Sequence, residues 1–339
     1  MPHKKILDFK EDINPIGVSK RVKNSLRKSI KHIESREQKG IVHLTEYLAR
    51  LFNITEENIV PGYGFSHIFS GVLEMLKPDV ILIPSPISNF YRSFFETTSK
   101  SILSYEKSII DNKYYDTNEL EQLIEKSDLI ILPNPHNVTG KKLNCDDIED
   151  IVAIADREKK VVLFDECLIE FTDIKSHAQC ITSSNYSLIL RTFSTYHAMA
   201  GLPLGYAIGS VKSIKNIKNV LYPYLARIPT LSCYAAVASF KDKGYRKRTL
   251  ETIKAEKDYI INRLKENEYI KVIDRGCNFI LLEIIGDHKS ISDGLYRRGI
   301  SVDIYHEKDG SFLRLPMRKH KLNAYFIKSL IQSLGHNKL

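Results

Sequence analysis

The sequence predicts an α/β protein with a mostly parallel central sheet covered by helices, followed by a smaller α+β domain. Three observations support this fold class. Short apolar runs alternate with longer amphipathic segments up to about residue 242. Apolar residues make up 43% of the 339-residue chain, which is sufficient for a large packed core. Beyond residue 242 a long charged segment leads into a second group of strands.

Five apolar runs are expected to form the central sheet. Each is five to seven residues long, and continuous apolar strands are typical of parallel sheets covered on both faces. In chain order they are DVILI (79–83), DLIILPN (128–134), KVVLFDE (160–166), SLILRT (187–192) and LGYAIG (204–209).

Helical patterns separate these strands, because apolar residues recur every three or four positions. Asp116 with Glu119 resembles a capping box, and Asn144 is a second expected cap. The expected helices span residues 65–76, 89–99, 117–127 and 145–160.

The C-terminal part reads as a separate unit. A charged helix over 243–269 is expected to precede the strands CNFILLEI, ISVDIY and SFLRL, with helices at 287–298 and 318–334. An amphipathic helix at 19–32 suggests that the N-terminus returns to this unit. The predicted division is a large domain over 36–242 and a small domain made of 1–35 with 243–339.

The composition narrows the class of protein. Lys and Arg number 50 against 41 Asp and Glu, and this net charge of +9 fits an anionic ligand or merely solvated lysines. No nucleic-acid-binding signature accompanies the basic residues, so nucleic acid is not an expected partner. The five cysteines are widely spaced without a CxxC pair, so neither disulfides nor a metal site are predicted. Without a recognisable signal peptide or membrane span, a cytoplasmic protein is expected.

Polar residues follow several of the predicted strands. Asn137 lies in the turn LPNPHNVTG, and Asp165 ends the apolar run VVLFD. Ligands of open α/β folds bind at the carboxyl edge of the sheet, where both residues would meet. A helix cap or a structural ion pair is the alternative explanation for Asp165.

The segment PGYGFSH (61–67) joins a short strand to a helix. Gly62 and Gly64 permit a tight bend, and the amides that open the helix can bind an anion. A single GxG is a weak signal. Together with Asn137 and Asp165, it suggests a heteroaromatic ligand that carries a phosphate.

The order of these motifs resembles the fold-type-I pyridoxal-phosphate enzymes, and within them the class I/II aminotransferases. The most similar branch is that of histidinol-phosphate aminotransferase and threonine-phosphate decarboxylase. The resemblance covers nearly the whole chain, from NPIG (14–17) through LARLFNITEENIVPGYG (49–64) and GLPLGY to NFILLE (278–283) and FLRL (312–315).

The resemblance implies roles for individual residues. Asp165 would pair with the pyridine nitrogen of pyridoxal or pyridoxamine phosphate, and Asn137 would bind the ring hydroxyl. Arg314 would clamp the carboxylate of an amino or keto acid, which the branch implies to be phosphorylated. The family also implies a homodimer. The cofactor phosphate would be held by Gly64, Phe65 and Ser194.

Several positions depart from the family pattern. The lysine that bonds to the cofactor aligns with Thr195, and a threonine hydroxyl can neither form an imine nor act as a base near neutrality. His197, two residues on, is a candidate replacement base. The family's phosphate-binding arginine aligns with Pro203, and its ring-stacking aromatic residue aligns with Ser88. The other departures, which weaken further contacts to cofactor or substrate, are Leu168, His67 and Asp303.

Three hypotheses remain open. The chain is a diverged aminotransferase that binds its cofactor non-covalently, with ordinary transamination in doubt. Alternatively, it is a non-catalytic relative, a pseudoenzyme that serves as a dimerisation or binding partner. The third hypothesis is a fold reused for another small anionic substrate without pyridoxal phosphate.

Overall fold

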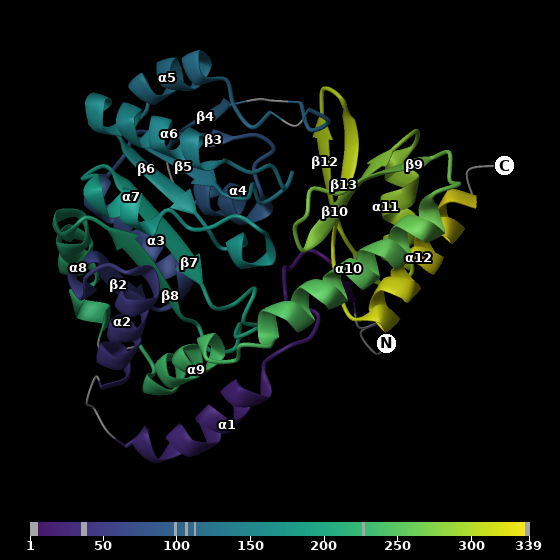
Figure 1. Ribbon diagram of the computed structural model, residues 1–339. Coiled ribbons are helices and arrows are strands. Elements are labelled where there is room, and N and C mark those ends of the chain that lie inside the picture. Colours follow the sequence, from purple (N-terminus) through teal and green to yellow (C-terminus); the bar gives the residue numbers. More distant parts are fainter. Residues whose placement is uncertain are drawn as a thin grey trace.

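A computed structural model describes residues 6–34, 39–97, 100–105, 108–111, 113–225 and 228–335. Figure 1 shows a larger unit built around one sheet and a smaller unit beside it, with helix α10 (Tyr245–Leu264) running between them. No helix in these described ranges is long and apolar enough to cross a membrane.

The larger unit contains a seven-stranded sheet in the order β2-β8-β7-β6-β5-β3-β4. Strand β8 is antiparallel to both of its neighbours, and the remaining pairs are parallel. This arrangement confirms the predicted mostly parallel sheet. The strands are β2 (Ile59–Gly62), β3 (Val80–Pro84), β4 (Ser101–Tyr105), β5 (Leu129–Pro133), β6 (Val161–Asp165), β7 (Ser187–Thr192) and β8 (Gly205–Gly209).

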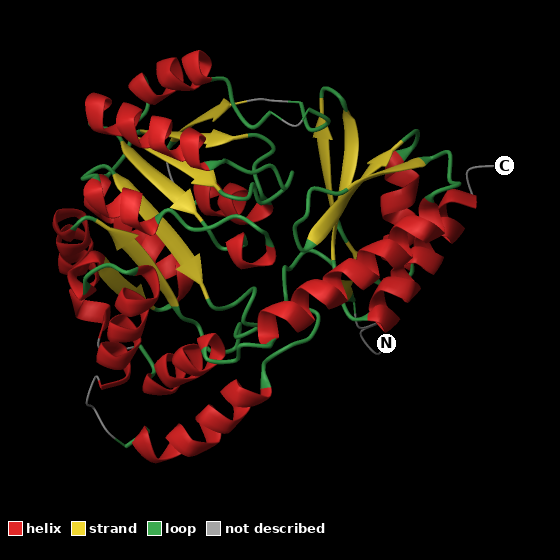
Figure 2. Cartoon of the chain, viewed as in Figure 1, coloured by secondary structure: helices red, strands yellow, loops and turns green. Residues whose placement is uncertain are grey.

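Helices cover both faces of this sheet (Figure 2). On one face, apolar side chains of the strands pack against α3 (Gly64–Leu76), α4 (Asn89–Glu96) and α8 (Val211–Leu225). The other face packs against α2 (Lys39–Phe52), α5 (Thr117–Glu125), α6 (Cys145–Glu158), α7 (Ala178–Ser183) and α9 (Thr230–Phe240). Alternate strand residues face opposite ways, so both layers bury apolar area.

The predicted helix starts have physical caps. The side chain of Asp116 accepts a hydrogen bond from the amide of Glu119 at the start of α5. Asn144 accepts from the amide of Asp147 and forms a reciprocal capping box at the start of α6.

The smaller unit holds an antiparallel sheet in the order β12-β13-β10-β9, with α10, α11 (His288–Arg297) and α12 (His320–Gly335) against it. In this sheet Arg314 on β13 lies directly opposite Asp303 on β12. The strands are β9 (Ile270–Ile273), β10 (Phe279–Ile284), β12 (Asp303–Glu307) and β13 (Gly310–Pro316).

The N-terminal residues connect the two units. Strand β1 (Leu7–Asp8) pairs in parallel with β11 (Ile300–Ser301) of the smaller unit. Helix α1 (Lys20–Ser29) packs instead against α9 of the larger unit. The expected boundary between residues 35 and 36 lies outside the described residues, so the division into 36–242 and 1–35 with 243–339 remains a proposal.

Gly205 permits a close approach between β7, β8 and the start of α3. A Cβ at this position would lie 2.7 Å from the carbonyl oxygen of Arg191 and 3.3 Å from the amide nitrogen of Phe65. Both neighbours are backbone atoms and cannot rotate away. The Gly64–Phe65 turn is therefore held against the end of the sheet.

We predict that Gly205→Ala lowers the free energy of unfolding by about 1–3 kcal/mol, because the added methyl group would overlap backbone atoms that cannot move aside. Gly201→Ala is the matched control, since a Cβ there meets nothing within 4 Å. Urea denaturation followed by circular dichroism measures both. Equal stability of the two variants would contradict the proposed close packing.

Candidate active site

The predicted site residues meet in one hollow of about 540 Å³, where the carboxyl ends of β5, β6 and β7 face the smaller unit. This is the edge at which open α/β sheets bind ligands. The structure therefore brings together residues that are up to 250 positions apart in sequence (64 to 314). The predicted residues among its walls are Gly64, Phe65, Asn137, Asp165, Ser194, Thr195 and Arg314.

Asp165 is buried at the end of β6 with only 3% of its surface exposed. Its Oδ2 accepts hydrogen bonds from the Tyr91 hydroxyl and from Nδ2 of Asn137, both at 2.9 Å. Its Oδ1 accepts from the amide of Cys167 at 3.0 Å. Three donors satisfy most of the acceptor sites of an ionised carboxylate, which otherwise could not remain buried.

Tyr91 is the residue that the sequence analysis missed beside Asp165. It lies on α4, is almost fully buried, and its pKa is raised well above the ordinary value by desolvation and then by the Asp165 charge. The phenol therefore stays protonated and serves as a donor. A tyrosine in a helical pattern gives no sequence signal for this contact.

Asn137, which lines the hollow, carries one buried polar atom without a partner among the described residues. Its Nδ2 is bonded to Asp165, whereas its Oδ1 has no hydrogen-bond partner within the described ranges. Ser88, which caps α4, likewise lines the hollow with a buried Oγ that is unpaired among the described residues. Buried unpaired polar atoms of this kind point to a polar ligand.

The start of α3 forms a second part of the wall. Gly64 has a φ of +82°, which favours glycine, and the cap residue Tyr63 gives the helix no side-chain hydrogen bond. The first amides of a helix lack acceptors within the helix, so they can bind an anion. The hydroxyls of Ser66 and Ser194 line the same hollow.

Thr195 lies in the wall of the hollow just beyond β7. Its hydroxyl donates to the carbonyl oxygen of Cys167 at 2.8 Å. Lys10 is the lysine among the residues that line the hollow, and its ammonium lies 3.8 Å from the Asp303 carboxylate near the mouth. The turn after β7 thus contributes a hydroxyl where the resemblance implies an amine.

Arg314 is buried and already has an anionic partner. Its Nη2 lies 2.9 and 2.8 Å from the two carboxylate oxygens of Asp12, and its Nε donates to the carbonyl oxygen of Asn137 at 2.7 Å. The guanidinium also stacks 3.8 Å above the ring of Phe279. The anionic partner of Arg314 in the described structure is therefore Asp12, which the sequence analysis did not identify.

His197 is not brought to the site, which corrects its candidacy as a base. Its ring packs about 5.0 Å from the rings of Phe193, Tyr196 and Phe240. Desolvation, followed by the Arg191 charge, lowers the pKa of His197 to about 3. Neither ring nitrogen has a hydrogen-bond partner in the described part of the chain, so this histidine is a neutral core residue.

Of the other positions that depart from the family pattern, four line the hollow and His67 does not. His67 is absent from its walls, and its Nδ1 accepts from the Tyr63 amide at 3.1 Å. Phe90 also lines the hollow and is an aromatic residue. It lies two residues after Ser88, the position at which the family pattern places an aromatic residue, so the sequence analysis did not identify it. The departures that do line the hollow are Ser88, Leu168, Pro203 and Asp303.

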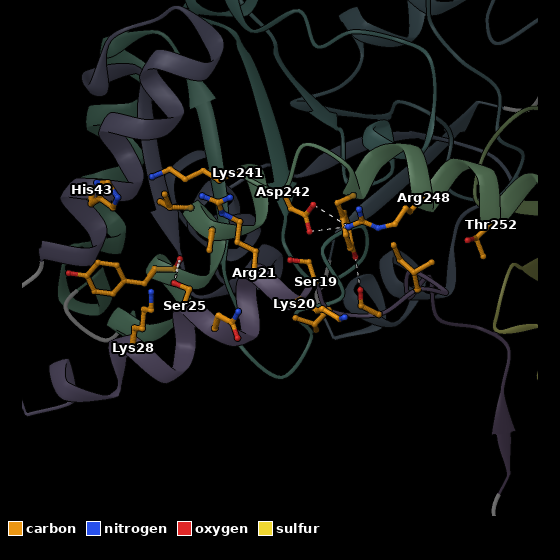
Figure 3. A pocket seen from close by; sticks show the side chains of 18 of the residues that line it. Ser19, Lys20, Arg21, Ser25, Lys28, His43, Lys241, Asp242, Arg248 and Thr252 are labelled. Carbon is orange, nitrogen blue, oxygen red and sulfur yellow. Dashed lines mark hydrogen bonds and ion pairs between the residues drawn. The ribbon is translucent and has the colours of Figure 1, made fainter.

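A larger groove of about 1170 Å³ lies away from this hollow, between α1, α9 and α10 (Figure 3). Lys20, Arg21, Lys28, Lys241 and Arg248 line it. Arg248 is paired with Asp242 at 3.1 Å, so part of this charge is internally compensated.

The residues of the hollow fit a pyridoxal-type ring. Asp165 retains acceptor capacity beside three donors, and Asn137 presents an unpaired buried oxygen in the described structure. Backbone amides and serine hydroxyls are available for a phosphate. Pro203 stands beside Gly64, so this end of the hollow offers neutral donors in place of the family's arginine.

We predict that Tyr91→Phe lowers the free energy of unfolding at pH 7 by about 1.5–3 kcal/mol, because a hydrogen bond to a buried charge is lost. Tyr63→Phe is the matched control, since Tyr63 is 47% exposed. Guanidinium denaturation measures both changes. A Tyr91 variant as stable as the control would contradict the role assigned to this phenol.

Comparisons with known proteins agree with this geometry. The family model for aminotransferase class I and II matches residues 6–330. Histidinol-phosphate aminotransferase 2 of Archaeoglobus fulgidus is 25% identical over 97% of the chain and 93% of its own length. A protein of Caldanaerobacter subterraneus named "Putative threonine-phosphate decarboxylase" is 27% identical over 94% of the chain and 88% of its own length.

Solved structures confirm the predicted fold type I. The histidinol-phosphate aminotransferase of Clostridium acetobutylicum superposes with a TM-score of 0.85 at 24% identity, covering 98% of this chain and 100% of its own. The enzyme of Sinorhizobium meliloti, solved with pyridoxal-5'-phosphate, gives 0.85 at 16% identity over 98% and 92% of the two chains. With the family model spanning nearly every residue, the chain belongs to the aminotransferase class I and II family.

Proposed function

We propose that this chain is a diverged aminotransferase that binds pyridoxal or pyridoxamine phosphate by non-covalent contacts alone. The family and the relative solved with pyridoxal-5'-phosphate support this cofactor. The observation that carries the proposal is the shared hollow, in which Asp165 and Asn137 face the turn that holds Thr195. The substrate would be a small amine or its carbonyl counterpart, a class that includes the amino or keto acid expected from the sequence.

Asp165 is the residue that would make the site chemically useful. When bound, the cofactor supplies an electron sink for the reacting carbon of the substrate. The Asp165 carboxylate would hold a proton on the ring nitrogen, because a fixed buried anion favours the nearby cation. Tyr91 and the Cys167 amide keep this carboxylate in place.

Thr195 would limit that chemistry. Its hydroxyl is engaged with the Cys167 carbonyl, and it can neither bond to an aldehyde as an amine does nor collect a proton near pH 7. We therefore propose that ordinary lysine-dependent transamination is absent. Pyridoxamine phosphate, which needs no covalent bond to the protein, would suit this site.

The phosphate end would bind more weakly than one with an arginine. A charge-assisted hydrogen bond contributes about 1.5–3 kcal/mol, and the described walls offer Gly64, Phe65 and serine hydroxyls at this end. We therefore expect the protein to bind its cofactor weakly enough for bound and free cofactor to exchange.

A second candidate is a non-catalytic subunit that pairs with another copy or with an active relative. Large apolar side chains are exposed near the N-terminal helix, including Ile30 at 55% and Ile33 at 64%. A partner that packs on this helix would remove these side chains from water. Turnover of an amino donor by the purified protein would exclude this candidate.

We predict that pyridoxal phosphate binds the unsubstituted protein reversibly and is removed by dialysis even after treatment with borohydride. Thr195→Lys should instead retain the cofactor after borohydride, because a new amine can form a reducible bond. Absorbance and intact-mass spectrometry measure retention.

Thr195→Met is the matched control, since it adds length without an amine. Borohydride fixation in the unsubstituted protein would contradict the non-covalent proposal and would point to Lys10 at the mouth. Absence of any spectral change on adding the cofactor would contradict the cofactor proposal itself.

A further inference from the structure

Arg314 presents most of its guanidinium to groups of the protein itself. Nη2 contacts both carboxylate oxygens of Asp12, and Nε is bonded to the Asn137 carbonyl. The side chains of Arg314 and Asp12 are only 5% and 17% exposed. A substrate carboxylate normally binds two nitrogens of an arginine side by side. Here Nη2 is bonded to Asp12 and Nε to the Asn137 carbonyl, so an incoming carboxylate would have to share Nη2 with Asp12 if it also binds Nη1.

A second carboxylate, that of Asp303, lines the same hollow as Arg314. Asp303 stands opposite Arg314 in the register of β12 and β13, and both line the hollow. Asp303 accepts from Nδ2 of Asn89 at 2.7 Å, and burial raises its pKa. The substrate side of the hollow therefore contains Asp12 and Asp303 around one buried arginine.

Asp12 is held in place by its own segment. The N-terminal strap, residues 6–17, contributes Lys10, Glu11 and Asp12 to the wall of the hollow. On one side of Asp12, Arg318 donates to the Glu11 carbonyl at 3.0 Å, and on the other Asn14 donates to the Tyr196 carbonyl at 2.8 Å. Nδ2 of Asn278 also bonds to Oδ1 of Asp12 at 2.8 Å.

We propose that Asp12 is a specificity-determining residue, a built-in counter-ion that keeps Arg314 from clamping a substrate carboxylate. An incoming carboxylate would have to share one arginine with Asp12 beside Asp303, and unfavourable like-charge contacts of this kind are a general means of rejecting ligands. The pocket thus selects amines or carbonyl compounds whose reacting end carries no carboxylate. The substrate class rests on the proposed function, whereas the effect of Asp12 on Arg314 does not.

The test compares two carbonyl probes with the same carbon skeleton, the acid 4-methyl-2-oxopentanoate and the uncharged 1-hydroxy-4-methylpentan-2-one. Ligand-observed NMR titration gives both dissociation constants, with and without pyridoxamine phosphate. The unsubstituted protein should bind the acid no more tightly than the alcohol. Asp12→Asn should raise affinity for the acid at least about tenfold, with little change for the alcohol.

Three further variants make the result specific. Glu11→Gln removes the same charge from the neighbouring residue and should leave acid affinity within about twofold, because no contact to Arg314 is lost. Adding Arg314→Met to Asp12→Asn should abolish the gain. Arg314→Met alone removes the counter-charge of Asp12 and Asp303 and should therefore lower acid affinity. If Asp12→Asn does not fold, the preference of the unsubstituted protein between the two probes decides the question.

A clear preference of the unsubstituted protein for the acid, lost in Arg314→Met, would overturn the inference. So would an Asp12→Asn variant that folds and gains no affinity. If the cofactor does not bind, the proposed function is wrong. The affinities measured without cofactor would still test the effect of Asp12 on Arg314.

Discussion

The hydrogen bonds that a buried carboxylate requires, at the end of a parallel strand, determine how the surrounding segments are arranged. The Asp165 carboxylate is buried where the two units meet, and a phenol, an amide side chain and a backbone amide satisfy it with hydrogen bonds. Those donors come from α4, from the turn after β5 and from the segment after β6. Satisfying one charge thus fixes the relative positions of three segments, and the hollow forms where they meet.

On the wall formed by the smaller unit, the hydrogen bonds of Arg314 likewise hold separate segments together. Its bond to the Asn137 carbonyl ties the small sheet to the turn that also holds Asp165. Its pair with Asp12 ties the N-terminal strap to the same place. The two walls of the hollow are therefore joined through Asn137, and a ligand would enter a site in which Arg314 is already paired with Asp12.

The sequence predicted most of the central sheet because buried parallel strands are continuous apolar runs, which Leu129–Pro133 and Ser187–Thr192 illustrate. The same criterion missed β4, whose SILSY pattern is partly exposed and interrupted by serines. It also missed α2, α8 and α9, because no cap signal was recognised at their starts and α9 is apolar on most sides.

The sequence predicted the site residues that belong to strand-end motifs, but not those brought to the site by packing between distant segments. Asp165 and Asn137 follow strands, so topology alone places them at one edge. The contacts of Tyr91 and Asp12 depend on how a helix and an N-terminal segment pack across more than 70 and 300 residues of sequence. His197 shows the opposite error, since proximity in sequence to Thr195 did not place its ring in the hollow.

The most direct test of this account is the ¹⁵N NMR spectrum of ring-labelled pyridoxal phosphate bound to the protein. The account predicts a protonated ring nitrogen near neutral pH that becomes unprotonated in Asp165→Asn. A bound cofactor whose nitrogen is unprotonated in the unsubstituted protein, or unaffected by the substitution, would contradict the central role assigned to Asp165.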